Sequence, residues 1–271
     1  MRALLAIAAA ASAALAAPAP AEPQDETAAL ARIAERGRLL YEVDKAGFEA
    51  MEHFLSEVPA ATNWPVTGWV AERGAEAGAY TVTFYGAGPA GAPFAGPGGR
   101  VAMFESQMKD GTPVAGRKID PSARPPLSDA QQALARAREA AMVNVNVTAK
   151  ARPCTSGRFD AVVIPPEQPG GPIDAYMLTP QEGFESLPLG GHYLVRVAAD
   201  GKVAERRELA NGCLNVLRPA EGPVMTANPL GPLPTEIHVF ASYANELPVI
   251  VWTERQAWLV DRDKITRADA N

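Results

Sequence analysis

The stretch Tyr193–Leu209, YLVRVAADGKVAERREL, does most to decide the fold class. Asp200-Gly201 favours the tight turn of a β-hairpin, because such turns need residues that tolerate positive φ angles. The residues before the turn alternate in polarity, which is the period of a half-buried strand. A two-residue loop would place Arg196 opposite Glu205 as an oppositely charged pair across the two strands. The residues on the core face of the first strand are expected to be Tyr193, Val195 and Val197.

Other segments of the chain have the same strand-like composition, with β-branched and aromatic residues between glycine, proline, asparagine or aspartate. The predicted strands are 67–71, 80–85, 100–107, 112–118, 159–164, 173–179, 236–243, 247–253 and 257–260. The last three are expected to form a closing antiparallel meander. Proline-rich loops are expected between several of them, including 219–234.

Two helices are predicted. Apolar or small residues recur at steps of three and four from Asp25 to about Val58, which is the spacing of one helical face. Ser128 with Gln131 has the form of a capping box and opens an alanine-rich helix that runs to about Met142. Because helices and antiparallel strands are segregated along the chain, the fold class is α+β. We expect a helix–strands–helix segment over residues 22–145 and a β-rich segment over 146–271, which together could form one continuous domain.

The N-terminal residues predict export. Met1 and Arg2 precede an alanine- and leucine-rich run, Ala3–Ala17, and small-x-small cleavage patterns follow it. This is the pattern of a signal peptide, predicted over residues 1–21, with cleavage between Ala17 and Glu22. The alternative is a buried N-terminal helix. No later stretch approaches the roughly 18 apolar residues of a membrane span, so the mature protein is expected in the periplasm without membrane insertion.

The chain has two cysteines, Cys154 and Cys213. In an oxidising compartment an even pair predicts a disulfide bond. The alternatives are two buried free thiols or a redox site, although the chain has no C-x-x-C motif. The formal net charge is −6, which excludes the basic surface that nucleic-acid binding requires. The expected partners are an unknown small molecule, a peptide or an envelope protein.

Three parts of the sequence resemble a group of uncharacterised exported bacterial proteins. The residues that carry the resemblance are Gly37–Tyr41 with Asp44, Gly190–Tyr193 with the hairpin that continues to Leu214, and Pro234–Phe240. The resemblance covers most of the mature chain and implies export and an intact fold. It implies no activity, cofactor or active site.

No motif in the sequence indicates a cofactor or a metal. Gly86–Gly91 matches G-x-G-x-x-G after a strand, but a dinucleotide site also needs a helix to begin there. Prolines and further glycines follow instead, so we interpret the segment as a loop. We therefore predict neither a cofactor nor a metal ion.

Asp44 is the most unusual single residue, because it lies in the middle of the apolar stripe of the first predicted helix. A carboxylate at such a position must be paired, hydrogen-bonded or protonated. It could act as a general acid or base. The structural alternatives are an ion pair, with an arginine as the expected partner, or a position at a wet edge of the helix.

Three histidines complete the candidates. His53 is expected at the surface of the first helix. His192 is expected on a polar strand face with Leu194 and Arg196, and His238 on a strand face with its neighbours at alternate positions. Both are weak catalytic candidates beside Asp44, and either could equally be an ordinary sheet residue. We predict a non-catalytic binding or interaction protein, with a hydrolase-like enzyme using Asp44, His192 or His238 as the alternative.

Overall fold

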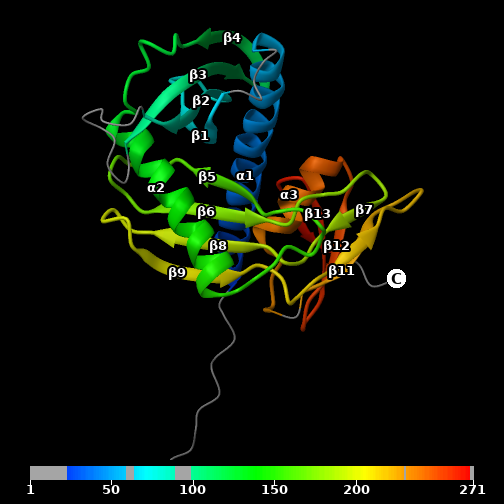
Figure 1. The fold of residues 1–271 in the computed structure, drawn as a ribbon. Coiled ribbons are helices and arrows are strands. Elements are labelled where there is room, and N and C mark those ends of the chain that lie inside the picture. The colour runs from blue at the N-terminus through cyan, green and yellow to red at the C-terminus, as the bar shows by residue number, and fades with distance from the viewer. Residues whose placement is uncertain (1–22, 59–63, 89–98, 229, 269–271) are drawn as a thin grey trace, which may run out of the picture.

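Two helices, each followed by a four-stranded antiparallel sheet, account for most of the molecule (Figure 1). The structure is a computed structural model that describes residues 23–58, 64–88, 99–228 and 230–268. The predicted α+β class is confirmed. The predicted signal peptide lies outside the described residues.

The first helix, α1 (Pro23–Glu57), confirms the long helix predicted from Asp25. Its apolar stripe is buried, and Leu40, Val43 and Phe54 lie in the main hydrophobic core. The first sheet follows, and its strands lie side by side in chain order. They are β1 (Val66–Arg73), β2 (Ala79–Ala87), β3 (Arg100–Lys109) and β4 (Thr112–Lys118). No helix among the described residues is long and apolar enough to cross a bilayer.

The second helix and the second sheet repeat this order. The predicted capping box is present at Ser128, and α2 (Asp129–Val143) continues into a short π-helical turn, Asn144–Thr148, that the sequence did not indicate. The second sheet has the order β5-β6-β8-β9. Its strands are β5 (Asp160–Ile164), β6 (Ile173–Leu178), β8 (Tyr193–Val197) and β9 (Val203–Glu208).

Both faces of the second sheet are covered, α1 lying on one face and α2 on the other (Figure 1). The core face predicted for β8 is the one against α2, where Val195 and Val197 are buried. The other face carries the charged residues Arg196, Glu205 and Arg207, as the sequence predicts, but His192 and Leu194 are buried, each only 2% exposed. The alternation of polarity within one strand cannot show that a helix from a distant part of the chain packs on the second face of the sheet.

The β8–β9 hairpin pairs Arg196 with Glu205, as predicted. Its loop is longer than expected. A two-residue loop would pair Val197 with Ala204, whereas Val197 pairs with Val203 in the structure. A register shift between Arg196 and Val197 then restores the predicted pairing. An extra residue of this kind is a β-bulge, which strengthens the local twist of the hairpin.

The predicted strand over 236–243 is wrong, because these residues form a helix, α3 (Glu236–Asn245). Thr235 caps the helix and exchanges capping-box hydrogen bonds with His238. Residues on every side of α3 are buried, so its sequence lacks the polar face by which a surface helix is recognised.

A third sheet packs against α3 and includes one parallel pair, β11 with β12. Its strands are β11 (Val224–Ala227), β12 (Val249–Trp252), β13 (Ala257–Asp261) and β14 (Lys264–Arg267). Two of the predicted closing strands are therefore confirmed, whereas β11 lies in a segment predicted as loop. A two-stranded ribbon of β7 (Ser186–Pro188) and β10 (Asn215–Leu217) lies beside it.

The crossing of α1 and α3 joins the beginning and the end of the described chain. Gly37 makes this possible, because a Cβ atom there would lie 2.4 Å from Cβ of Val239 and 2.6 Å from the carbonyl oxygen of Glu236. The main core accordingly contains residues from α1, both large sheets and α3. The two predicted segments thus share one core.

The predicted disulfide bond between Cys154 and Cys213 is present, with a Cα–Cα distance of 5.2 Å. It ties the segment before β5 to the segment after β9. Gly191 passes close beside it with a φ angle of 70°, and a Cβ atom there would lie 2.3 Å from Sγ of Cys154. The bond therefore links the two segments that flank the second sheet in the chain.

Candidate functional site

A cleft of about 750 Å³ opens between the two large sheets and over α1. One wall is the end of β1 with the turn that leads into β2, residues 73–80. The other wall is the β5–β6 loop together with Asp174 and Arg196 of the second sheet. Ligand sites are commonly clefts of about 300–1,000 Å³, and this one has that size.

The floor of the cleft is one face of α1. Arg32, Glu35, Leu39 and Glu42 line it, and their spacing of three and four residues places them along a single stripe of the helix. At 1.5 Å per residue, the stripe is about 15 Å long. The floor therefore carries charges of both signs along its length.

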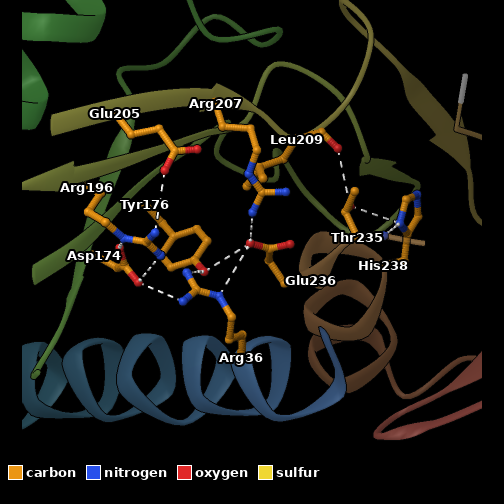
Figure 2. A network of polar contacts seen from close by, with 10 residues as sticks. All are labelled: Arg36, Asp174, Tyr176, Arg196, Glu205, Arg207, Leu209, Thr235, Glu236 and His238. Carbon is orange, nitrogen blue, oxygen red and sulfur yellow. Dashed lines mark hydrogen bonds and ion pairs between the residues drawn. The ribbon is translucent and has the colours of Figure 1, made fainter. Parts of the chain in front are cut away.

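Arg36 connects this floor to the wall formed by the second sheet (Figure 2). Its Nη1 donates to Oδ2 of Asp174 at 2.7 Å, and its Nη2 donates to the hydroxyl of Tyr176 at 2.6 Å. Desolvation of Arg36 opposes its charge, but the electrostatic effects of Tyr176 and Asp174 and the hydrogen bond to Asp174 leave its pKa above the ordinary value. Arg36 is thus a fixed cation at the cleft.

Asp174 also holds a second arginine in place. Nε of Arg196 donates to Oδ1 of Asp174 at 2.9 Å, and Nη2 donates to Oδ2 at 3.3 Å. Arg196 also lies 3.5 Å from Oε2 of Glu205. The two arginines lower the pKa of Asp174, although its partial burial acts in the opposite direction. This wall is therefore a set of ion pairs whose geometry is fixed by two strands and a helix.

Glu236 is the buried end of the same network, with only 3% of its side chain exposed (Figure 2). Its Oε1 accepts hydrogen bonds from Arg207 at 2.7 Å and from the hydroxyl of Tyr176 at 3.2 Å. Nε of Arg36 lies 3.7 Å away. The position in the first turn of α3 also favours a negative charge, because the helix dipole is positive at that end.

The wall formed by the first sheet has a smaller polar cluster. The hydroxyl of Tyr80 donates to Oε2 of Glu42 at 3.0 Å, and Arg38 pairs with the same carboxylate. Burial, together with the neighbouring Glu42, raises the pKa of Tyr80 to about 12. Tyr80 therefore remains a neutral hydrogen-bond donor at any physiological pH.

Four charged side chains of the cleft have no hydrogen bond or ion pair within the described part of the chain. They are Arg32 and Glu35 on α1, Arg73 at the end of β1 and Glu167 in the β5–β6 loop. All four are exposed. These are the charges that remain free to meet a ligand.

His192 does not line the cleft. Its Nδ1 accepts a hydrogen bond from the amide of Thr179 at 3.1 Å, and its Nε2 donates to the carbonyl oxygen of Pro188 at 2.9 Å. Burial lowers the pKa of His192 to about 4. Both ring nitrogens are thus occupied by backbone groups, and the side chain joins the residue after β6 to the last residue of β7.

His238 also lies away from the cleft, inside α3 rather than on the predicted strand. Its Nδ1 accepts from the amide of Thr235 at 2.9 Å and lies 3.1 Å from the Thr235 hydroxyl (Figure 2). Burial lowers the pKa of His238 to about 4. This histidine is part of a helix cap.

Asp44 lies on α1 outside the cleft lining, and the predicted ion pair with an arginine is not formed among the described residues. Burial of its carboxyl raises the pKa of Asp44 to about 7, and the charge of nearby Asp160 adds to the effect. The side chain nevertheless keeps part of its surface exposed. Asp44 therefore combines a raised pKa with the absence of a hydrogen-bond or ion-pair partner among the described residues.

The structure also brings together a serine and a histidine that sequence analysis did not pair. Nδ1 of His53 lies 2.8 Å from Oγ of Ser106, and Ser106 is 0% exposed. A nucleophile must reach its substrate, so this buried pair is a structural contact between α1 and β3. His53 itself is partly exposed.

The glycine-rich segment after β2 does not open a helix in the described residues. The next element that the structure describes is the strand β3, and residues 89–98 lie outside the description. Nor do the described residues contain three or more histidine, cysteine, aspartate or glutamate side chains placed to hold one metal ion.

Asp44, His192 and His238 thus form no hydrogen bond or ion pair with one another in the described structure, and none of them lines the cleft. The residues of the cleft escaped sequence analysis because their partners lie far apart in the chain. No family model, curated protein or solved structure matches the chain.

Proposed function

We propose that the protein is an exported, periplasmic, non-catalytic binding protein that holds a polar ligand in the cleft over α1. The observation that carries the proposal is the fixed set of ion pairs around Arg36, Asp174 and Arg196 in one wall of that cleft. A wall that is ordered before the ligand arrives reduces the entropic cost of binding.

Export is supported by the signal-peptide pattern at the N-terminus and by the disulfide bond, which suits an oxidising compartment. N-terminal sequencing of protein isolated from the periplasm should find a mature chain that begins between Ala17 and Glu22. An intact Met1 in that fraction would contradict export by this route.

The binding proposal is tested by thermal shift and calorimetry with a panel of polar metabolites, peptides and metal ions. A ligand at 100 times its Kd stabilises a protein by about 2.7 kcal/mol, which corresponds to roughly 5–10 °C in Tm for a chain of this size. Arg32→Glu with Arg73→Glu should reduce the shift, because both arginines are free, exposed and in the cleft.

The matched control is Arg255→Glu, which reverses the charge of an exposed arginine in the β12–β13 turn, away from the cleft. It should leave the shift unchanged. A ligand whose effect on Tm is the same in all variants binds elsewhere and contradicts the assignment of the cleft.

One observation favours the alternative, a hydrolase-like enzyme. The pKa of about 7 at Asp44 suits a general acid or base at neutral pH. If Asp44 is catalytic, Asp44→Asn should abolish turnover of any ester, glycoside or peptide substrate that the wild-type protein hydrolyses. Hydrolysis that survives the substitution would exclude Asp44 as the acid or base.

A further inference from the structure

The free charges of the cleft are balanced in sign and are distributed over its floor and both walls. Arg32 and Glu35 stand on the floor, Arg73 on the wall of the first sheet and Glu167 on the opposite loop. The remaining charged residues of the lining are held in ion pairs within the protein, such as Arg36 with Asp174. The cleft therefore offers a ligand two free positive and two free negative groups.

Complementarity to this pattern requires a ligand that carries both signs of charge. A purely anionic ligand beside Arg32 would be repelled by Glu35 on the same helix. A purely cationic ligand beside Glu35 would be repelled by Arg32. An uncharged ligand would use neither, while like-charge contacts disfavour the wrong partner. A zwitterion with separated ends can place each end beside an opposite charge.

The length of the cleft floor sets the length of a ligand that fills it. The floor is about 15 Å long, since it spans the helical stripe from Arg32 to Glu42. An extended peptide rises about 3.3 Å per residue, so four to five residues fill this length. A single amino acid could contact Arg32 and Glu35, which lie one helical turn apart, but it would leave Arg73, Glu167 and most of the floor unused.

Apolar surface between the charges can receive peptide side chains. Leu39 on the floor and Ile164, Pro165 and Pro166 on the β5–β6 side all line the cleft. Polar groups that fix orientation and apolar groups that fill volume are the usual composition of a ligand site.

We infer that the cleft binds a short zwitterionic peptide of about four to five residues, with a free ammonium at one end and a free carboxylate at the other. This inference rests on the proposed binding function and names its ligand class. The peptide carboxylate pairs with Arg32 or Arg73, and the ammonium pairs with Glu35 or Glu167.

The test uses tetra-alanine and penta-alanine as probes in isothermal titration calorimetry with the full mature chain. Both peptides with free ends should bind, and acetylated, amidated versions should bind at least tenfold more weakly. Blocking one end alone should give an intermediate loss. Raising the salt concentration should weaken the binding of the free peptides, because exposed charge pairs are screened.

Variants assign each end of the peptide. Arg32→Ala and Arg73→Ala together should remove the preference for a free carboxylate, and Glu35→Gln with Glu167→Gln should remove the preference for a free ammonium. The controls are Arg255→Ala and Glu254→Gln, which change the same residue types in the exposed β12–β13 turn. They should bind both peptides as the wild-type protein does.

The outcomes separate the inference from the function on which it rests. Equal affinity for free and blocked peptides, or no peptide binding, overturns the inference. If a sugar or a small dicarboxylate binds instead and the arginine variants abolish that binding, the binding function stands and the peptide is wrong. If no polar ligand produces a thermal shift, both are wrong.

Discussion

Glu236 shows what one buried charge requires of its surroundings. Its carboxylate is almost fully covered and is held by Arg207, Tyr176 and Arg36, which come from two strands and a helix. Removing one member of a buried ion pair lowers the free energy of unfolding more than replacing the whole pair by apolar residues does, because the remaining charges lose their partner.

We therefore expect Glu236→Ala to destabilise the protein by about 1.5–3 kcal/mol in urea unfolding, since the arginines that remain keep 29% and 43% of their side chains exposed to water. Glu205→Ala is the matched control, since Glu205 is exposed and lies 3.5 Å from its arginine. An exposed pair of this kind contributes at most about 1 kcal/mol. Equal losses in the two variants would mean that the buried ion pairs of Glu236 contribute no more to stability than the exposed pair of Glu205.

Asp44 predicts a pH dependence of stability. The native pKa of about 7 lies above the ordinary value of 3.8, so the native state binds this proton more tightly than the unfolded chain. Its contribution is complete below about pH 4 and is lost as the pH rises through 7.

Asp44→Asn removes the titration and should therefore stabilise the protein above pH 7. The gain at pH 8 should approach, as an upper limit, roughly 4 kcal/mol, at about 1.36 kcal/mol per unit of pKa shift. Near pH 4 the two proteins should differ little. Denaturant unfolding at both pH values measures this, and a difference independent of pH would contradict the raised pKa.

At the scale of elements, the contact between α1 and α3 depends on the absence of a side chain at Gly37. Alanine is the better helix former by about 1 kcal/mol. A Cβ atom at Gly37, however, would overlap both Val239 and the backbone of Glu236. The overlap with backbone cannot be relieved by rotating a side chain.

Gly37→Ala should consequently destabilise the protein by about 1–3 kcal/mol, despite its better helix propensity. Ala31→Gly, at an exposed position six residues earlier on α1, is the control and should cost about 1 kcal/mol through propensity alone. Thermal unfolding of both variants would test this, and a stabilised Gly37→Ala protein would show that the helices can separate.

The elements that sequence analysis predicted well are those with a local signal. The stripe of α1, the Ser128 cap of α2 and the Asp200-Gly201 turn each act within a few residues. The failure at α3 has an equally physical cause, because Ile237 and Val239 alternate with His238 and Phe240 and are compatible with a strand. Burial of the helix on all sides removes the polar face that would have corrected this.

At the scale of the whole molecule, the disulfide bond constrains a loop defined by a sequence separation of 59 residues. The chain-entropy model gives an upper value of about 4 kcal/mol for a loop of this length. Cys154→Ser with Cys213→Ser should lower the unfolding free energy by up to that amount. Because Cys213 is exposed, mild reduction of the wild-type protein should give the same loss.

The matched control is the double variant, whose unfolding free energy should be the same with and without reductant. A wild-type protein that keeps its stability after complete reduction would show that the second sheet closes without the bond. Unfolding in urea, with thiol quantification, distinguishes these outcomes.

The cleft could not have been predicted from the sequence because no local pattern carries it. Arg36, Asp174 and Arg196 come from three separate elements, and each is unremarkable within its own segment. His192 and His238 were predicted as candidate catalytic residues because histidine is the usual titrating residue. In the structure, however, they are held by backbone groups of Thr179 and Thr235. Only the packing of α1 between the sheets determines which charges become partners.

The docking of α1 on α3 also fixes an order of events during synthesis. Gly37 leaves the ribosome about 200 residues before Val239, against which it packs. At about 5–20 residues per second, this interval lasts roughly 10–40 s. During that time the apolar stripe of α1 has no native cover from α3. If the chain is exported as proposed above, the late arrival of this cover would favour an unfolded chain while the membrane is crossed.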